Sequence, residues 1–512
     1  MVIKILMLVV FFGIMVAVGI YCRKHATDVN GFVLGGRSVG PWLSAFAYGT
    51  SYFSAVIFIG YAGQFGWKFG LASTWIGIGN ALVGSLLAWT ILGRRTRLMT
   101  HHLDSATMPE FFGKRYDSKK LKVMSSAIIF IFLIPYTASL FNGLSRLFGM
   151  AFHIDYTVCI IGMAILTGVY VVVGGYMATA VNDFIQGCIM LVGIVLVIGA
   201  VLKENGGFLA SVDGLARITD SAVTETPGVF ASFFGPDPFS LLAVFILTSL
   251  GTWGLPQMVQ KFYAIKSEAS IDKGTVISTI FALIVAGGCY FLGGFGRMFS
   301  DRIDLAAEGY DSIIPKMLES LPEILIAVVV ILVLSASMST LSALVLASSS
   351  TLTLDFLKDN FIKNMTQKSQ VMTMRWLIVL FIAISSVIAI VQYKSTVTFI
   401  AQLMGISWGA LAGAFLAPFL YGLYWKGVTR ISVLVNFIFG TGLMIMNLLF
   451  RSAFPIWLQS PINCGAFAML AGLIIVPVIS LLTPKFSREH TDRMFACYEE
   501  KVVVSVKQAL GE

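Results

Sequence analysis

The sequence Leu332-Val333-Leu334-Ser335-Ala336-Ser337-Met338-Ser339-Thr340-Leu341-Ser342 places a row of hydroxyl groups in the middle of an apolar segment. At helical spacing Ser335, Ser339 and Ser342 share one face. Thr340 lies beside that face. An unsatisfied polar group in hydrocarbon raises the free energy by several kcal/mol, so this stripe needs partners. Two interpretations remain open from these residues alone: close packing against another membrane helix, or coordination of a small hard cation by oxygen atoms.

The composition is typical of a multi-span helical membrane protein. The mean hydropathy is +0.87, 57% of the 512 residues are hydrophobic and only 12% are charged, which excludes a soluble globular protein. The net charge of +9 therefore needs no nucleic-acid partner to explain it. We predict an all-α polytopic protein with thirteen transmembrane helices, near residues 3–22, 41–66, 71–92, 123–150, 156–174, 181–202, 238–260, 274–296, 322–355, 374–392, 396–424, 431–450 and 463–482.

Lysine and arginine residues set the predicted orientation. If the N-terminus is outside, most of them fall in segments that face the cytoplasm, among them residues 23–40, 93–122, 261–273 and 483–512. The positive-inside rule therefore predicts a multi-pass protein of the plasma or inner membrane with its N-terminus outside and its C-terminus in the cytoplasm.

Two predicted spans are interrupted near mid-membrane. The second span contains polar and small residues in its interior, in the run Ala47-Tyr48-Gly49-Thr50-Ser51-Tyr52-Phe53-Ser54. The seventh contains two glycines and a proline, in the run Gly251-Thr252-Trp253-Gly254-Leu255-Pro256. Either run alone fits a simple kink. Each, however, opens a possible five-helix unit, and the second unit enters the bilayer from the opposite side. Paired breaks in inverted repeats indicate a transporter's binding site at the membrane midplane.

Intramembrane carboxylates are typical of proton-driven pumps. The candidate in this sequence is Asp183, at the cytoplasmic start of the sixth predicted span, where an acid also complements the helix dipole. Proton coupling is therefore disfavoured. The sequence has no GxSxG, no HExxH and no intramembrane acid pair, so we expect no catalytic residues, no enzyme and no cofactor.

The chain resembles the sodium/solute symporter family over roughly residues 5–450, and is most similar in its motifs to the bacterial proline and pantothenate branches. The ordered set of motifs is Gly35-Gly36-Arg37-Ser38-Val39-Gly40-Pro41, Trp75-Ile76-Gly77-Ile78-Gly79, Met108-Pro109-Glu110-Phe111-Phe112, Gly174-Gly175 with Asp183 and Gln186, Gly254-Leu255-Pro256-Gln257, and Met338-Ser339-Thr340-Leu341-Ser342.

This resemblance implies a leucine-transporter-type inverted repeat of five plus five helices, with one extra helix before and two after. The implied divisions are residues 1–40 for the first helix and a cytoplasmic loop, 41–203 for the first repeat (helices 2–6), 238–425 for the second repeat (helices 7–11), 426–482 for helices 12 and 13, and 483–512 for a cytoplasmic tail.

The resemblance also implies a sodium site between the first broken helix and the serine-rich helix. Carried over residue by residue, the site comprises the backbone carbonyls of Thr50, Phe53 and Ala336 and the hydroxyls of Ser339 and Thr340. Neutral oxygens suit a monovalent ion, so the resemblance favours the cation interpretation of the stripe. Na⁺ is then the coupling ion and the only metal.

Two positions depart from the family pattern. The proline branch has an Asp where this chain has Tyr52, so proline transport does not carry over directly. Members with two sodium ions build a second site from serines of the ninth span and the acid of the sixth; here Asp183 and Ser342 match, but Ala343 replaces a serine. We therefore expect one sodium ion per solute, with Asp183 and Ser342 as candidates for a second sodium site or an exit path.

The solute pocket is expected beside the ion, between the two breaks. By position its candidates are Ser54, Ala55, Tyr136, Trp253, Gln257, Gln402, Ser407 and Trp408. For the aromatic candidates, packing or contact with lipid is the alternative. No cluster of basic residues is expected at this depth, so an anionic solute would be held by half-helix dipoles, neutral donors or the sodium ion.

The sequence therefore predicts a sodium-coupled symporter that imports a small organic solute by alternating access, such as proline or another amino acid, or a carboxylate such as pantothenate. The alternative is a transporter-like solute sensor without net transport. The expected partners are the solute, sodium and membrane lipid, with no nucleic acid, and a monomer is expected to suffice. Substrates vary widely on one fold, so the sequence does not name the solute.

Overall fold

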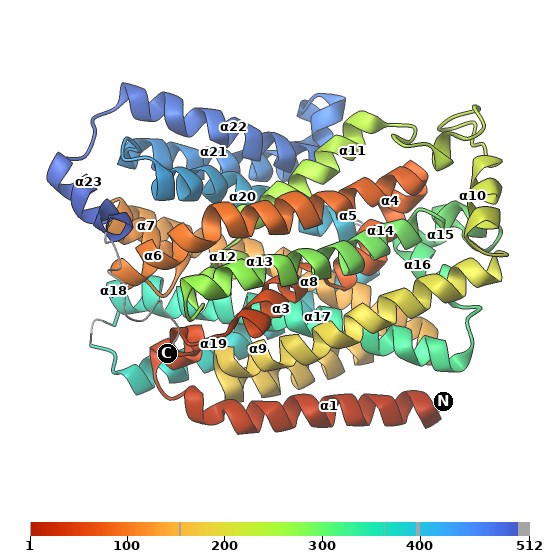
Figure 1. The fold of residues 1–512 in the computed structure, drawn as a ribbon, viewed down its shortest axis with the longest axis horizontal. Coiled ribbons are helices and arrows are strands. Elements are labelled where there is room, and N and C mark those ends of the chain that lie inside the picture. The colour runs from red at the N-terminus through yellow and green to blue at the C-terminus, as the bar shows by residue number, and fades with distance from the viewer. Residues whose placement is uncertain (1, 153–154, 363, 396–399, 500–512) are drawn as a thin grey trace, which may run out of the picture.

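The computed structural model describes residues 2–152, 155–362, 364–395 and 400–499, and over these residues the chain is helical, without a β-strand. The long helices run side by side along the long axis of the molecule (Figure 1). Eleven of them within the described part are long and apolar enough to cross a membrane. The all-α, multi-pass class is thereby confirmed.

Some of the membrane spans lie in long helices. They are α1 (Val2–Cys22), α8 (Lys119–Phe152), α9 (Tyr156–Glu204), α17 (Glu323–Thr351), α19 (Gln367–Ser395), α20 (Ile400–Tyr424), α21 (Arg430–Leu449) and α22 (Pro461–Leu482). Of these, α9 is interrupted at Gly175.

Other spans are assembled from shorter pieces joined by π-helical or 3-10 turns. These assemblies are α3 (Pro41–Tyr52) with η3 (Val56–Tyr61) and α4 (Ala62–Phe69); α5 (Thr74–Ala81) with η5 (Leu82–Leu87), η6 (Trp89–Gly93) and α6 (Arg94–His102); α11 (Pro238–Phe245) with η8 (Ile246–Leu250), η9 (Gly251–Trp253) and α12 (Pro256–Tyr263); and α13 (Glu268–Ala282) with η10 (Leu283–Gly287) and α14 (Gly288–Gly293).

Short helices cover the two ends of the bundle. They are η1 (Arg23–His25), α2 (Val29–Leu34), η2 (Gly35–Arg37), η4 (Gly70–Ser73), α7 (Met108–Arg115), α10 (Phe208–Ala216), η7 (Val229–Ala231), η11 (Gly296–Arg302), α15 (Leu305–Glu308), η12 (Tyr310–Ser312), α16 (Ile313–Leu318), η13 (Leu352–Leu357), α18 (Lys358–Asn360), η14 (Arg451–Ala453), η15 (Ile456–Gln459), α23 (Arg488–Phe495) and η16 (Ala496–Tyr498). Helices α10, α15 and α16 lie at the right end in Figure 1, where α1 begins, and α7, α18 and α23 lie at the left end.

Two of the candidate spans are longer than one crossing requires. Val56–His102 has 47 residues and Tyr156–Glu204 has 49, whereas about 20 residues suffice. Each contains a glycine in the left-handed region, Gly70 at φ +64° and Gly175 at φ +57°. A Cβ on Gly70 would lie 2.0 Å from the carbonyl oxygen of Phe230, so glycine is required for the turn there.

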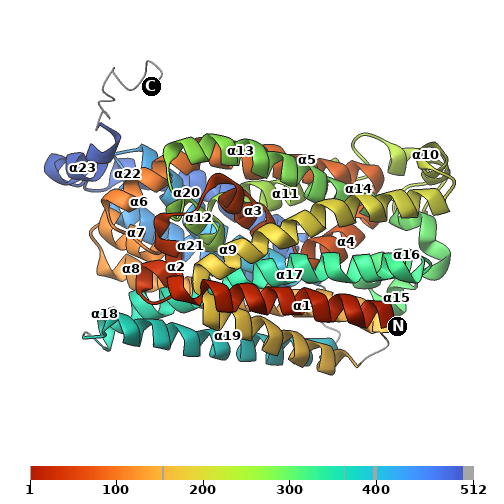
Figure 2. The ribbon, with the colours of Figure 1, turned by 60° about the horizontal axis from the view of Figure 1, so that its bottom comes forward.

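The serine-rich helix α17 lies in the interior, and α1 lies at the edge. The most apolar window of α17 is 83% buried, against 22% for α1. Figure 2 shows α1 and α19 along one side of the bundle. A helix that carries a hydroxyl stripe thus meets protein on nearly all sides, which gives each hydroxyl access to a partner.

Local sequence explains where several spans begin. Pro41, Pro238 and Pro256 each occupy the first turn of a helix, where the missing N–H has no intrahelical acceptor to lose. Asp155 caps α9 by accepting from the backbone N–H of Thr157 at 2.8 Å.

The structure corrects two predicted boundaries. Residues 261–273 were predicted as a cytoplasmic loop, but α12 continues to Tyr263, so the prediction is wrong for Lys261, which is buried. The predicted gap between spans at 175–180 shrinks to a single non-helical residue, Gly175. The predicted span 396–424 begins outside the described residues, as does the end of the tail, and α20 starts at Ile400.

The segments next to the two broken spans are joined directly. The Val39 N–H donates to the carbonyl of Ala264 at 3.2 Å, and the Lys266 N–H donates to the carbonyl of Val39 at 3.0 Å. This bridge fixes the residues before α3 beside those after α12. The start of the first broken span and the end of the second are therefore held at the same end of the bundle.

Candidate sodium and solute site

Each interrupted span contains one residue of extended backbone at its break. Phe53, after α3, has φ −83° and ψ 122°, and Leu255, before α12, has φ −82° and ψ 123°. Pro256 therefore starts a half-helix instead of kinking a continuous one. The breaks leave carbonyls at the end of α3 without helical partners. At the start of α12, Pro256 has no N–H and the Met258 N–H donates to the carbonyl of Leu255 at 3.1 Å.

Five oxygens from the first break and from α17 come together. The Ser339 hydroxyl lies 3.1 Å from the carbonyl oxygen of Thr50 and 3.0 Å from that of Ala336. The Thr340 hydroxyl lies 3.1 Å from the Thr50 oxygen, 3.2 Å from the Phe53 oxygen and 3.1 Å from the Ala336 oxygen. All the residues predicted for the sodium site are thus adjacent and buried.

This cluster contains more acceptors than protons. A hydroxyl has one proton to donate, so Ser339 and Thr340 supply only two hydrogen bonds for their five short contacts with carbonyl oxygens. The remaining lone pairs face one another at the negative end of the α3 dipole. Such a set of neutral oxygens fits a small hard cation.

The other hydroxyls of the stripe, Ser342 and Ser335, make no hydrogen bond with the first break. The Ser342 hydroxyl donates to the carbonyl of Ser339 at 2.8 Å, within its own helix. The Ser335 hydroxyl is buried and makes no hydrogen bond with the described residues. Ser339 and Thr340 therefore carry the interaction with the first break.

Three aromatic rings line the space next to the first break. The Trp408 ring of α20 lies 5.7 Å from the ring of Tyr52 and 5.9 Å from the ring of Tyr136. Trp408 also reaches the second break, because a Cβ on Gly251 would lie 3.2 Å from its Cε3 atom. Tyr136 and Trp408 were predicted for the solute pocket, whereas Tyr52 had been noted only as a departure from a family pattern.

Buried polar groups around these rings have unused hydrogen-bonding capacity. Those that make no hydrogen bond of ordinary geometry with the described residues are Ser54 Oγ, Tyr136 Oη, Trp408 Nε1, Tyr52 Oη and both side-chain amide atoms of Gln257. The Tyr136 hydroxyl lies near Ser54 and Trp408, and the Tyr52 hydroxyl near Tyr290. Buried polar atoms are normally satisfied, so a group of unsatisfied ones between the two breaks marks a place for a polar ligand.

The other predicted pocket residues have different surroundings. Trp253 Nε1 donates to the carbonyl of Val83 at 2.9 Å, and the Ser407 hydroxyl donates to the carbonyl of Phe132 at 2.6 Å. Ala55 packs against Gly143, where an added Cβ would lie 3.1 Å from the Ala55 Cβ. Gln402 lines a separate cavity nearer one end of the bundle.

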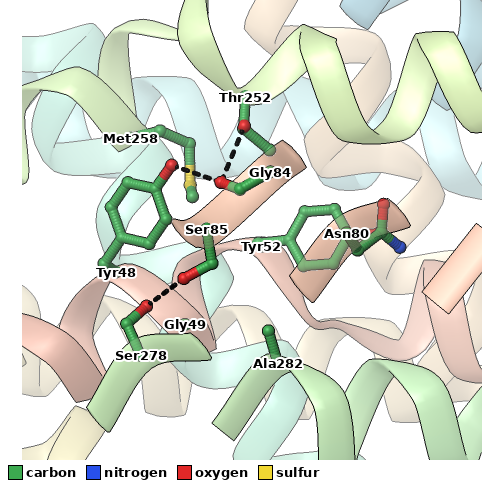
Figure 3. A pocket seen from close by; sticks show the side chains of 10 residues that line it. All are labelled: Tyr48, Gly49, Tyr52, Asn80, Gly84, Ser85, Thr252, Met258, Ser278 and Ala282. Carbon is green, nitrogen blue, oxygen red and sulfur yellow. Dashed lines mark hydrogen bonds between the residues drawn. The ribbon is translucent and has the colours of Figure 1, made fainter. Parts of the chain in front are cut away.

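A small cavity lies next to the first break, beside Tyr48 and Tyr52 (Figure 3). Its volume is about 10 Å³, room for about one water molecule. The Tyr48 and Thr252 hydroxyls both donate to the carbonyl of Gly84 across it, at 2.8 and 3.1 Å. These bonds join the first broken span, η5 and the second broken span.

Larger polar cavities lie at both ends of the bundle. One, of about 740 Å³, is lined by Gln402, Asp220 and Arg297 among others. The hydrogen bond from Arg297, 2.8 Å long, holds the pKa of Asp220 below its ordinary value. The other cavity, of about 350 Å³, is lined by Glu110 and Lys122 among others.

Asp183 has a partner that sequence reasoning missed. Its Oδ2 atom lies 3.7 Å from Nζ of Lys261 in α12, and both side chains are buried. Lys261 had been assigned to a loop because it follows the apolar segment of the seventh span. The available signal was its position only five residues after Pro256, within the first turns of a half-helix.

In the described part of the chain, no group of three or more His, Cys, Asp or Glu side chains could hold a metal ion. Spans broken at mid-length, with carbonyls facing a hydroxyl stripe, are typical of ion-coupled membrane transporters.

Comparison with known proteins agrees with this class. The model of the sodium:solute symporter family matches residues 32–440, and the chain belongs to this family of transport proteins. It is 29% identical over 496 residues to a sodium/proline symporter of Staphylococcus aureus strain JH9, covering 94% of this chain and 93% of the relative.

Two solved structures share the fold. A Na⁺-coupled sialic acid symporter in a substrate-bound outward-open state has a TM-score of 0.73 at 16% identity, covering 95% of this chain and 99% of that one. Mhp1, a nucleobase-cation-symport-1 family transporter in a closed conformation, has a TM-score of 0.52 at 14% identity, covering 90% of this chain and 97% of that one. At these identities the likeness concerns the fold alone.

Proposed function

We propose that this protein imports a small organic solute together with one sodium ion by alternating access. Sodium binds the carbonyls of Thr50, Phe53 and Ala336 and the hydroxyls of Ser339 and Thr340. The observation that carries this proposal is the excess of acceptors over protons among these five oxygens, at 3.0 to 3.2 Å from one another in each measured contact. A bound cation satisfies all of them at once.

The proposed layout has thirteen crossings, with the N-terminus outside and the C-terminus in the cytoplasm. The positive φ angles of Gly70 and Gly175, which interrupt the two overlong helices, support two crossings in each of them. The nearly identical backbone angles of Phe53 and Leu255 support inverted repeats over residues 41–203 and 238–425. Residues 1–40, 426–482 and 483–512 then flank the repeats.

The proposed solute pocket lies between the two breaks, around Ser54, Tyr136, Gln257 and Trp408. The N-terminus of α12 has no side-chain cap at Leu255. Pro256 has no N–H and the Met258 N–H donates to the carbonyl of Leu255 at 3.1 Å, so the Gln257 N–H and the positive end of the helix dipole are what this terminus offers a carboxylate. Neutral donors, the dipole and the sodium ion suit a small zwitterionic amino acid or a carboxylate. Ala55, Trp253 and Ser407 support the walls, and Gln402 lies on the path from outside.

The positions of the two end cavities support alternating access. Polar cavities of about 740 and 350 Å³ lie at opposite ends of the bundle, and in this proposal the solute enters from one end and leaves at the other as the helices move apart on one side at a time. One sodium ion contributes about 2.3 kcal/mol from a potential of 100 mV and about 1.4 kcal/mol from a tenfold gradient. Together these accumulate a neutral solute on the order of several hundredfold.

A thermal-shift screen followed by uptake tests the proposal. Purified protein is heated with amino acids, carboxylates, sugars or pantothenate, with and without sodium, because a ligand of the native state raises the apparent melting temperature. The solute that stabilises only with sodium is then loaded outside proteoliposomes. Sodium-driven uptake is expected. Sodium-dependent stabilisation without uptake would identify a sensor instead, and no sodium effect on any solute would contradict the proposal.

A further inference from the structure

Asp183 and Lys261 form an isolated pair of charges deep in the bundle. The carboxylate belongs to α9 and the ammonium to α12, and their side chains are 1% and 3% exposed. Charges buried this far from water need an opposite charge beside them. Each is therefore the counter-ion on which the other depends.

The pair is held by charge and not by a tight hydrogen bond. The separation of 3.7 Å is long, and neither oxygen of Asp183 makes a hydrogen bond with the described residues. By contrast, Lys122 lies 2.6 Å from Asp359 near the end of the bundle. The Asp183 carboxylate thus keeps most of its acceptor capacity while its charge is balanced.

Two of the hydroxyl groups near this pair donate to backbone carbonyls. Tyr170, a neighbour of Asp183, donates to the carbonyl of Met338 at 2.8 Å, and Ser342 donates to the carbonyl of Ser339 at 2.8 Å. The Lys261 ammonium lies over the ring of Tyr176, 5.1 Å from its centre. The region therefore offers a carboxylate with a resident cation beside it. The hydroxyl of Tyr176 and the amide oxygens of Asn182 and Gln186 make no hydrogen bond with the described residues, so the charge of Lys261, and not a shortage of oxygens, opposes an added ion.

We propose that the Lys261 ammonium takes the place of a second sodium ion at Asp183 and so fixes the coupling at one sodium ion per solute. This inference rests on the proposed function. A cation with a permanent tether balances the carboxylate in every step of the cycle, so no second ion needs to be taken up from outside or released inside.

Electrostatic repulsion makes the exclusion strong. A sodium ion bound to Asp183 would lie within about 4 Å of the ammonium, and at an effective dielectric constant near 20 that repulsion weakens its affinity on the order of a thousandfold. The absence of a hydroxyl at Ala343 adds to this effect but is the lesser cause. Restoring the hydroxyl alone is thus not expected to restore a site.

Equilibrium binding of sodium-22 to the purified full chain, with sodium as the only ligand, tests the inference. Wild type and Ala343→Ser are expected to bind one sodium ion. Lys261→Met combined with Ala343→Ser is expected to bind two, because the tether is replaced by an uncharged side chain of similar length. The matched control, Lys261→Arg with Ala343→Ser, keeps the charge and is expected to stay at one.

The possible results distinguish a failure of the proposed function from a failure of the inference about Lys261. A wild type that binds no sodium would overturn the proposed function and this inference with it. A wild type that binds one ion, while the folded Lys261→Met/Ala343→Ser protein also binds one, would overturn the inference alone. Because loss of Lys261 leaves a buried acid and can impair folding, Ala343→Ser provides an independent decision: two ions bound with Lys261 intact would show that the ammonium excludes nothing.

Discussion

Two polar regions inside the bundle handle positive charge in different ways. At Ser339 and Thr340, hydroxyls and carbonyls converge without any formal charge. At Asp183 and Lys261, a full negative charge faces a full positive charge with few hydrogen bonds. Neutral oxygens can bind and release an ion repeatedly at moderate energetic cost, whereas a buried ion pair is expensive to separate. The comparison suggests a site for cargo beside a site with a permanent counter-ion.

The largest expected effect concerns the ion pair. Asp183→Asn leaves the Lys261 ammonium unpaired and is expected to destabilise the protein by about 3–5 kcal/mol. The double variant Asp183→Asn/Lys261→Met removes both charges and is expected to recover most of that loss. Apparent melting temperatures of the two variants and wild type in one detergent measure the effect. If Asp183→Asn is as stable as wild type, Asp183 and Lys261 are not a buried ion pair on which stability depends, and the distinction between the two regions is wrong.

A second buried carboxylate sharpens the comparison. Asp311 accepts from the N–H of Ile400 at 3.2 Å at the start of α20, and burial raises the pKa of Asp311 from the ordinary 3.8 to about 6. The folded protein then holds this proton more tightly than the unfolded chain. Stability from this group is therefore present at low pH and is lost as pH rises from about 4 to about 6.

Asp311→Asn tests this pH dependence. It is expected to remove up to about 3 kcal/mol of the pH-dependent change in stability between pH 4 and 7. Melting curves of wild type and variant over that range supply the measurement. If both curves change in parallel with pH, the carboxylate does not titrate as described.

Gly175 directs the part of α9 that carries Asp183. Its φ of +57° is unfavourable for alanine, and an added Cβ would lie 3.0 Å from the carbonyl oxygen of Phe32. Gly175→Ala is expected to lower stability by about 2 kcal/mol. Gly162→Ala in the same helix is the control, because no atom lies within 4 Å of its Cβ, and there the change is expected to be neutral or stabilising. Equal melting temperatures for both variants would contradict the turn at Gly175.

The sequence predicted features within one segment of the chain better than contacts between distant segments. The hydroxyl stripe and the two breaks are local patterns, so spacing and residue type were enough to predict that Ser339 and Thr340 need partners. The carry-over of Thr50 and Phe53 required the family resemblance, and these residues do meet α17. The ion pair between Asp183 and Lys261 joins distant segments, and no local sequence pattern predicts such a pair.

The aromatic pocket illustrates the same limit. Tyr136 and Trp408 were candidates by position, but the role of Tyr52 depends on how α3 and α20 pack. Trp253 and Ser407 prove to hydrogen-bond backbone carbonyls of neighbouring helices, a choice that their positions in the sequence do not reveal.

The smallest expected effect concerns the solute. Tyr136→Phe removes one unpartnered hydroxyl and is expected to weaken solute binding about fivefold to tenfold while sodium binding stays unchanged. Tyr421→Phe is the control, since that hydroxyl donates to the carbonyl of Leu473 between α20 and α22. Titrations of the solute found in the screen, at saturating sodium, give the ratio. Equal affinities for wild type and Tyr136→Phe would show that the Tyr136 hydroxyl does not bind the solute.

The central claim is that the neutral oxygens bind the coupling ion, and sodium-22 binding to Ser339→Ala/Thr340→Ala tests it most directly. The control is Ser349→Ala/Ser350→Ala, which removes two buried hydroxyls of the same helix that donate only within α17. We predict that wild type and control bind one sodium ion with equal affinity, and that Ser339→Ala/Thr340→Ala binds it at least about a hundredfold more weakly. Wild-type affinity in the folded Ser339→Ala/Thr340→Ala protein would contradict the account.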